Sequence, residues 1–241
     1  NVTPEKQFEK AIAKNPADTS NYLKLAEYYT SQNRLEDAEK ILTRALEASG
    51  GDVNIRERLE DMQLRRLREQ VGVAQKRYGT EKSEEAKTLY ARFGNELLQR
   101  ELEIYAARAE RYPTNLGFRY EVGTRLKKGG KPREAIPYLQ QALGDSRRKG
   151  EVMLLLGECF QSLKPPQAKL AMTNYAGAVE AISDMDADMK KLALYRAGWL
   201  TLQLKDLDRA ESYLTTLAGM DFAYKDVATL LDKIAELRDN S

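Results

Sequence analysis

One stretch of the sequence, from Glu151 to Ala178, limits the fold most strongly because large and small apolar residues recur in it at helical spacing. Met153, Leu156 and Phe160 share one stripe of a helix, since 3.6 residues per turn bring positions i, i+3 and i+7 together. Gly157 leaves a notch beside this stripe, where a second backbone can approach closely. After a polar turn, the second half repeats the arrangement with Ala171, Tyr175 and Ala178. The stretch therefore predicts two antiparallel helices, which cannot cover their own apolar faces without neighbours.

The same alternation of large and small residues recurs on both sides of this stretch, so the sequence predicts an all-α chain of stacked helix-turn-helix units. The first complete unit spans Asp18–Ala48 and is followed by Gly50–Gly51, since glycine favours the position just after a helix. A final amphipathic helix, Asp226–Arg238, is expected to cap the open end of one continuous stack. We predict three parts: an N-terminal helix and the first unit at 1–51, a degenerate unit at 52–112, and three units with the capping helix at 113–241.

The middle part, residues 52–112, breaks the rhythm of the repeats with two helices that are longer than ordinary repeat helices. Asp52 can cap the first, which continues to about Arg77; Gly79–Thr80 is the predicted turn, and the second helix is Ser83–Arg111. Acidic and basic residues are mixed on both helices, which favours a solvated surface with ion pairs at i, i+4. The alternative is a projecting coiled-coil arm through which the chain self-assembles, although the apolar seam does not keep a strict heptad.

The N-terminus begins with a helix signal, because Thr3 is a good N-cap and Pro4 stands at the favoured first helical position. This helix resembles the second helix of a pair whose first helix is missing, and the chain has no initiator Met. Both features indicate a processed product or an excised part of a longer protein. The sequence has no apolar run long enough for a membrane span and no signal peptide at 1–4, so we expect a soluble protein, with the cytoplasm slightly favoured.

Residue types that catalysis and metal binding require are scarce. Histidine is absent, which removes the commonest general acid or base and the commonest metal ligand. Cys159 is the only cysteine, so neither an internal disulfide nor a thiolate metal site can form. Asp184, Asp186 and Asp188 resemble the start of a calcium loop, but no glycine or closing glutamate follows at the required positions. With no glycine-rich phosphate loop, we expect no catalytic site, no metal and no cofactor.

The repeated pattern resembles the tetratricopeptide repeat (TPR), a helix-turn-helix of about 34 residues with fixed small and large positions. Four alanines hold matching places at the start of second helices: Ala38, Ala135, Ala171 and Ala210. The tryptophan of the repeat is replaced everywhere, by Tyr22, Arg119, Met153 and Leu194. The resemblance implies a right-handed α-solenoid of TPR-type repeats, here with one pair of lengthened helices. It also implies that the first helices line a concave groove that binds peptides or helices of other proteins.

Carried over to this sequence, the groove positions of the family lie one residue after the aromatic slot and further along each first helix. These positions are Leu23, Glu27, Thr30, Tyr120, Thr124, Lys127, Lys128, Leu154, Glu158, Gln161, Tyr195, Trp199 and Gln203. Trp199 is the only tryptophan and falls off the buried stripe, so it is the favoured anchor for a partner, together with Tyr120, Leu154 and Tyr195. The alternative for Trp199 is packing against the capping helix or a neighbouring unit.

The resemblance also argues against one known subclass, in which lysine and asparagine of successive first helices grip a peptide's C-terminal carboxylate. The matching positions here hold other residue types, such as Leu23, Glu27, Thr124 and Glu158, so no carboxylate clamp is expected. A second function class is binding of nucleic acid or of another acidic partner through Pro113–Gly150, where nine Lys/Arg face three acids. No RNA-binding motif supports it. The favoured function is therefore a non-catalytic protein-interaction scaffold.

Overall fold

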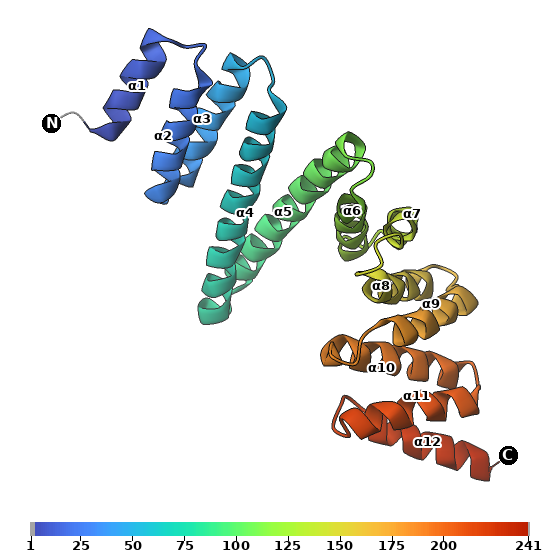
Figure 1. Cartoon of the computed structure of the whole chain (residues 1–241). Coiled ribbons are helices and arrows are strands. Elements are labelled where there is room, and N and C mark those ends of the chain that lie inside the picture. Colours follow the sequence, from blue (N-terminus) through green and yellow to red (C-terminus); the bar gives the residue numbers. More distant parts are fainter. Residues whose placement is uncertain (1–2, 241) are drawn as a thin grey trace. The chain divides into compact units, whose positions relative to one another are not determined.

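The computed structural model describes residues 3–240, and within that range the chain forms twelve α-helices and no strand (Figure 1). The chain divides into two compact units, one ending at Ile104 and the other beginning at Tyr105. This division falls inside a helix, whereas the sequence places part boundaries at 51/52 and 112/113; the latter stay a prediction. The all-α helical repeat fold expected from the sequence is confirmed.

The first unit contains α1 (Pro4–Lys14), α2 (Thr19–Ser31), α3 (Leu35–Ala48), α4 (Val53–Glu81) and most of α5 (Glu84–Arg111). Helices α2 and α3 form the predicted hairpin, and their apolar faces meet Ile12 of α1 and both Ile55 and Leu59 of α4. The residues of the hairpin that are buried in this core are Tyr22, Leu25, Ala26, Tyr29, Ala38, Ile41, Leu42 and Ala45. Burial of that shared apolar surface holds the helices side by side.

Helix ends follow the local chemistry that the sequence predicts. The Thr3 hydroxyl accepts a hydrogen bond from the Lys6 N–H at 3.4 Å, and Pro4 begins α1. Asp52 accepts the N–H groups of Asn54 and Ile55 at the start of α4. Gly50 and Gly51 both have a positive φ, 67° and 95°, which glycine adopts without a steric cost.

The turn of the long helical pair lies later than the sequence predicts. Helix α4 continues through Gly79 and Thr80 to Glu81, and the chain reverses at Lys82, whose φ is 49°. A lone glycine inside a helix costs only about 1 kcal/mol relative to alanine, so it need not end one. The Ser83 hydroxyl accepts the Ala86 N–H at 3.2 Å and so caps α5. Both helices are long, at 29 and 28 residues, as expected.

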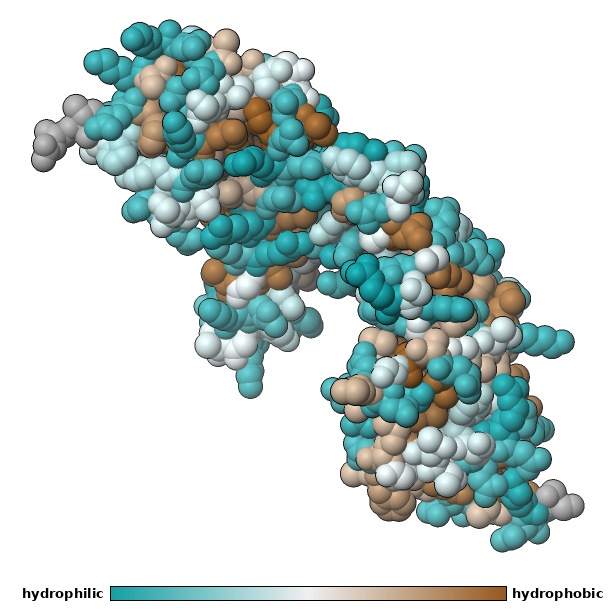
Figure 2. Space-filling view, in the orientation of Figure 1, coloured by the Kyte–Doolittle hydropathy of each residue, from teal (hydrophilic) through white to brown (hydrophobic). Residues whose placement is uncertain are grey.

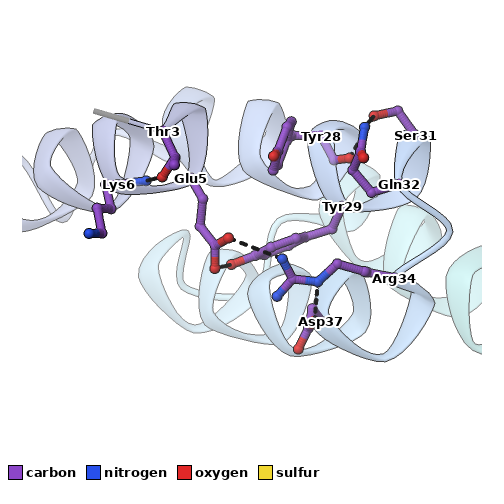
Figure 3. A network of polar contacts seen from close by, with 9 residues as sticks. All are labelled: Thr3, Glu5, Lys6, Tyr28, Tyr29, Ser31, Gln32, Arg34 and Asp37. Carbon is purple, nitrogen blue, oxygen red and sulfur yellow. Dashed lines mark hydrogen bonds and ion pairs between the residues drawn. The ribbon is translucent and has the colours of Figure 1, made fainter. Parts of the chain in front are cut away.

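A polar network ties α1 to the first hairpin (Figure 3). The Glu5 carboxylate accepts a hydrogen bond from the Tyr29 hydroxyl at 2.9 Å and another from the Arg34 guanidinium at 3.0 Å. Arg34 also pairs with Asp37 at 2.7 Å and stacks over the Tyr29 ring, 4.4 Å from its centroid. The bonds from Arg34 and then from Tyr29 hold the pKa of Glu5 below its usual value of 4.5.

We predict that this network makes the docking of α1 sensitive to acid. A carboxyl whose pKa is lower in the folded state stabilises the fold above its ordinary value of 4.5, and that contribution is lost as pH falls through the folded pKa. The difference in unfolding midpoint between the wild type and Glu5→Gln should therefore be largest near neutral pH and shrink toward zero in acid. Glu36→Gln, which removes an exposed ion pair with Lys40 within α3, is the matched control. An equal, pH-independent loss in both variants would contradict the prediction.

The second unit contains the C-terminal end of α5, from Tyr105, and seven further helices, of which the last three are the reddest in Figure 1. They are α6 (Leu116–Lys128), α7 (Pro132–Ala142), α8 (Lys149–Ser162), α9 (Ala168–Ala181), α10 (Ala187–Gln203), α11 (Leu207–Met220) and α12 (Val227–Asp239). Each hairpin, α6/α7, α8/α9 and α10/α11, pairs a first helix with a second one, and α12 packs after α11 as the predicted capping helix.

In each of these hairpins, a large side chain of the second helix packs directly against a glycine of the first helix. A Cβ built on Gly157 would lie 2.4 Å from the ring of Tyr175, so the ring occupies the notch that the sequence predicts. Leu139 fills the notch at Gly123, and Leu214 fills the notch at Gly198, where a Cβ would meet the leucine at 2.7 and 2.6 Å. The repeat in the sequence thus corresponds to one packing arrangement, in which a side chain of the second helix fills the space beside a glycine of the first helix.

Candidate functional site

The structure contains a cleft in each unit that is lined by first-helix residues. In the first unit, a cleft of about 260 Å³ lies among α2, α3 and α4; we refer to it as the α2–α4 cleft. Its apolar lining residues are Leu23, Ala26, Leu42 and Met62, and its polar ones are Glu27, Thr30, Arg58, Asp61 and Arg65. Arg58 of α4 lies 3.5 Å from Glu27 of α2, so an ion pair crosses the cleft. Such a lining suits an amphipathic segment.

In the second unit, a cleft of about 500 Å³ is lined mainly by residues of α6, α8 and α10, the first helices of three successive hairpins, with one residue each from α7 and α9. We refer to it as the α6–α10 cleft. Its lining residues are Lys127, Gly130, Pro132, Glu158, Gln161, Ser162, Tyr175 and Arg196. Lys127, Glu158 and Gln161 were predicted from the groove positions of the sequence, and the structure brings all three together.

Charged groups in the α6–α10 cleft converge on one carboxylate. Glu158 accepts a bond from the Lys127 ammonium at 2.7 Å through one oxygen, and pairs with the Arg196 guanidinium at 3.1 Å through the other. Beside it, the Tyr175 hydroxyl donates to the Gln161 side chain at 2.6 Å. Burial raises the pKa of Tyr175, so the hydroxyl stays protonated and keeps donating. The cleft therefore carries two positive groups, one negative group and a fixed amide.

The predicted anchor Tyr120 and the predicted groove position Thr124 are both held by contacts inside the second unit. The Tyr120 hydroxyl donates a short hydrogen bond to Glu151, and the Arg148 guanidinium lies 4.5 Å from the centroid of its ring. Burial raises the pKa of Tyr120, and the bond to Glu151 adds to that rise. The Thr124 hydroxyl donates to the Glu121 carbonyl at 3.0 Å. Both side chains are half-buried on α6, outside the residues that line the α6–α10 cleft.

Tyr195 of α10 is engaged with the turn that precedes α12. Its hydroxyl donates to Asp226 at 2.9 Å, its ring meets Tyr224 edge-on at 5.9 Å, and the Lys225 ammonium lies 4.5 Å from its centroid. Trp199, one turn further along α10, is half-buried, so part of its ring reaches solvent. Of the two, Trp199 keeps more freedom to contact a partner, because no such polar bond ties it to the turn.

Two further predicted groove positions, Leu154 and Gln203, do not line the α6–α10 cleft. Leu154 is only 4% exposed, because α8 packs against neighbours on both sides and its apolar residues are covered around most of its circumference. It therefore offers almost no surface to a ligand. Gln203 is exposed at the end of α10 and lines a separate cavity of about 430 Å³ with α11 and α12.

Several lining residues were not singled out by the sequence. Arg196 follows Tyr195 directly and was passed over because the family positions fall on other residues of α10. The sequence does contain a signal for it, because Arg196 is the only charged residue between Leu192 and Leu202. Arg58, Asp61 and Arg65 belong to the lengthened α4, which the repeat pattern does not describe.

The basic segment Pro113–Gly150 is partly neutralised in the structure. Six of its nine basic residues form ion pairs: Arg119, Arg125, Lys127, Lys131, Arg147 and Arg148. Two of the acidic partners, Glu110 and Glu158, come from outside the segment, which is why the local count of charges overstates its field. Figure 2 shows hydrophilic residues mixed with hydrophobic patches on the face drawn.

Groups suited to chemistry are sparse in the described part of the chain. Cys159 is fully buried, and burial raises the pKa of its thiol to about 11, so a thiolate does not form at neutral pH. Among residues 3–240, no cluster of His, Cys, Asp and Glu lies close enough to hold a metal ion. Over the same range, no helix is both long enough and apolar enough to cross a membrane.

The stacked hairpins, with clefts along their first helices, define the class of all-α repeat proteins. Residues 5–57, which cover α1 to α3 and the start of α4, match the family described as the tetratricopeptide repeat. The match to the tetratricopeptide repeat thus covers residues 5–57, and the rest of the chain continues the same all-α helical repeat fold. No curated protein matches the sequence.

Solved structures share this fold at low sequence identity. YrrB, described as a TPR protein with an unusual peptide-binding site, is similar with a TM-score of 0.55 and 20% identity, over 93% of this chain and 97% of that one. The C-terminal part of a TPR repeat-containing protein from Cytophaga hutchinsonii gives a TM-score of 0.58 at 14% identity, over 94% and 93%. MamA from Desulfovibrio magneticus RS-1 gives 0.52 at 14% identity, over 86% and 97%.

Proposed function

We propose that this protein is a non-catalytic scaffold that binds a peptide or helix of a partner protein on the face formed by its first helices. The observation that carries the proposal is the α6–α10 cleft, because Lys127, Glu158 and Gln161 come from groove positions on successive hairpins and line one cleft. The α2–α4 cleft supports it independently, since Leu23 and Glu27 hold the corresponding positions in the first unit.

The size and lining of both clefts fit such a ligand. Clefts of about 260 and 500 Å³ accept single side chains of a segment, while the charged residues around them fix its orientation. The related YrrB is described as having a peptide-binding site. The acidic residues Glu110 and Glu158 pair with cations of the basic segment and lower its net charge, which weakens the attraction to nucleic acid on which the alternative function depends.

Trp199 provides the first test of this proposal. Peptides selected from a random peptide pool by binding to the full chain serve as the probe, and their affinity is measured by fluorescence anisotropy. Trp199→Ala should weaken binding about thirtyfold or more, because a buried aromatic anchor contributes about 2 kcal/mol. Helicity should stay unchanged, since the ring is only half-buried.

The matched control is Tyr213→Ala, which removes a half-buried aromatic ring from the second helix α11. It should leave the affinity within a factor of two or so, because α11 lies outside the proposed face. Equal losses of affinity in both variants, or loss of helicity in Trp199→Ala, would remove Trp199 from the site. Failure of every pool to bind the wild type would refute the proposed function.

A further inference from the structure

The α6–α10 cleft holds more positive than negative charge, and its single acid is shared. Lys127 and Arg196 both pair with Glu158, at 2.7 and 3.1 Å, and no other carboxylate lines the cleft. Their side chains are partly open to solvent, at 30% and 39%, whereas Glu158 is 16% exposed. Each cation therefore has bonding capacity left over, because an ammonium has three donors and a guanidinium has five.

One of these donors has no acceptor. The Arg196 Nε is buried and has no hydrogen-bond partner among the described residues. A buried donor left unmade costs about 1–3 kcal/mol, so the side chain gains when an acceptor is supplied. Its terminal nitrogens are the part open to a ligand, and a rotation of the side chain that uncovers the Nε edge would let one carboxylate satisfy Nε and a terminal nitrogen together, in the paired geometry that arginine prefers.

Gln161 and Ser162, which line the same cleft, offer further hydrogen-bond donors for a carboxylate. The Gln161 side-chain oxygen already accepts from Tyr175, which orients the amide and leaves its NH₂ group as a donor toward the cleft. Ser162 adds a hydroxyl at the edge. The cleft thus offers donors from α6, α8 and α10 around a volume of about 500 Å³, enough for the side chain of a passing peptide.

We propose that the α6–α10 cleft binds the carboxylate of an aspartate or glutamate side chain within an acidic peptide segment, for which Glu158 competes. This inference rests on the proposed function and adds the chemistry of its ligand. Charge complementarity supplies the occupant, because the cleft keeps a net positive charge after Glu158 is counted. Glu158 holds both cations in place when no ligand is bound, and it lowers the affinity that they would otherwise have for an acid.

The test uses the full chain and matched pools of short fluorescent peptides, amidated at the C-terminus. One pool carries glutamate at fixed positions and the other carries glutamine there, with the remaining positions random. The acidic pool should bind about tenfold more tightly, which corresponds to 1.4 kcal/mol. Binding should weaken in high salt, because the screening length falls from about 10 Å at 0.1 M to about 3 Å at 1 M.

Variants of the cleft locate the effect. Lys127→Met and Arg196→Met should each weaken binding of the acidic pool roughly tenfold, and Glu158→Gln should strengthen it by a factor of roughly three to ten. A gain of affinity cannot come from misfolding, which keeps the test valid if one of the cation variants is unstable. The control is Arg209→Met on α11, which removes the same charge from an exposed position outside the cleft.

The outcomes separate this inference from the proposed function. Equal binding of both pools, unchanged in the cleft variants, would overturn the acidic ligand while leaving a peptide-binding scaffold. Tight binding of a glutamine pool with a free C-terminus would show that the chain terminus is the ligand, and so would overturn the assignment to a side chain. If neither pool binds the wild type, both the inference and the scaffold function are overturned.

Discussion

Replacing Tyr175 by alanine should destabilise the second unit by about 3–5 kcal/mol, the usual loss when a large aromatic side chain is removed from a core. Tyr175 is fully buried, and its ring fills the notch at Gly157, so no neighbour can collapse into the space without moving a helix. Urea unfolding followed by circular dichroism measures the loss.

A conservative variant separates the ring from its hydroxyl. Tyr175→Phe keeps the ring in the notch and removes only the bond to Gln161, so it should cost about 1 kcal/mol. If Tyr175→Ala lowered the free energy of unfolding no more than Tyr175→Phe does, the hairpin α8/α9 would not depend on the ring. Packing of a large side chain against a glycine would then not explain the stability of the repeats.

Gly157→Ala should destabilise the chain by about 1–2 kcal/mol, although alanine is normally the better helix former by about 1 kcal/mol. The two effects oppose each other, and contact distances decide between them. The new Cβ would lie 2.4 and 2.5 Å from atoms of the Tyr175 ring, which is anchored at its other end by Gln161. The ring cannot move aside cheaply, so overpacking outweighs helix propensity.

The matched control is Gly72→Ala in the interior of α4, where a Cβ would meet nothing within 4 Å. There only the backbone effect remains, and alanine should stabilise the helix by about 0.5–1 kcal/mol. Opposite signs at the two glycines are therefore expected in the same unfolding assay. A stabilising effect at both positions would contradict the close contact between Gly157 and Tyr175.

The effect of Gly157→Ala should also depend on the residue at position 175. In the first unit, Ala26 and Leu42 hold the positions that Gly157 and Tyr175 hold in the third complete repeat, and both are buried in one core. Tyr175→Leu should therefore relieve most of the cost of Gly157→Ala, giving an interaction energy of about 1 kcal/mol in a double-mutant cycle. Purely additive losses would mean that the alanine clashes elsewhere.

Much of this fold could be predicted because its local signals agree with its packing. The spacing of Met153, Leu156 and Phe160, the notch at Gly157 and the N-cap at Thr3 each follow from rules that act within one or two turns of helix. Such rules need no knowledge of distant residues. The sequence therefore predicts which segments are helical and which side chains close each hairpin.

The errors concern choices that local rules do not decide. Gly79 reads as a breaker in sequence, yet the helix continues through it, because neighbouring turns of α4 and the cap at Ser83 favour a reversal at Lys82. Leu154 falls on a groove position by register but is buried, since the number of neighbours around α8 depends on tertiary packing. Arg196 was missed for the same reason: its role depends on where Glu158 lies across two helices.

Photo-crosslinking can show where on the chain partner peptides bind, which we expect to be along the first helices. Peptides selected from the random pool, each carrying a benzophenone side chain, are crosslinked to the full chain, and the attachment sites are mapped by mass spectrometry. The account predicts attachment to α2 and α4 in the first unit and to α6, α8 and α10 in the second. Attachment concentrated on the second helices α7, α9 and α11 would contradict it.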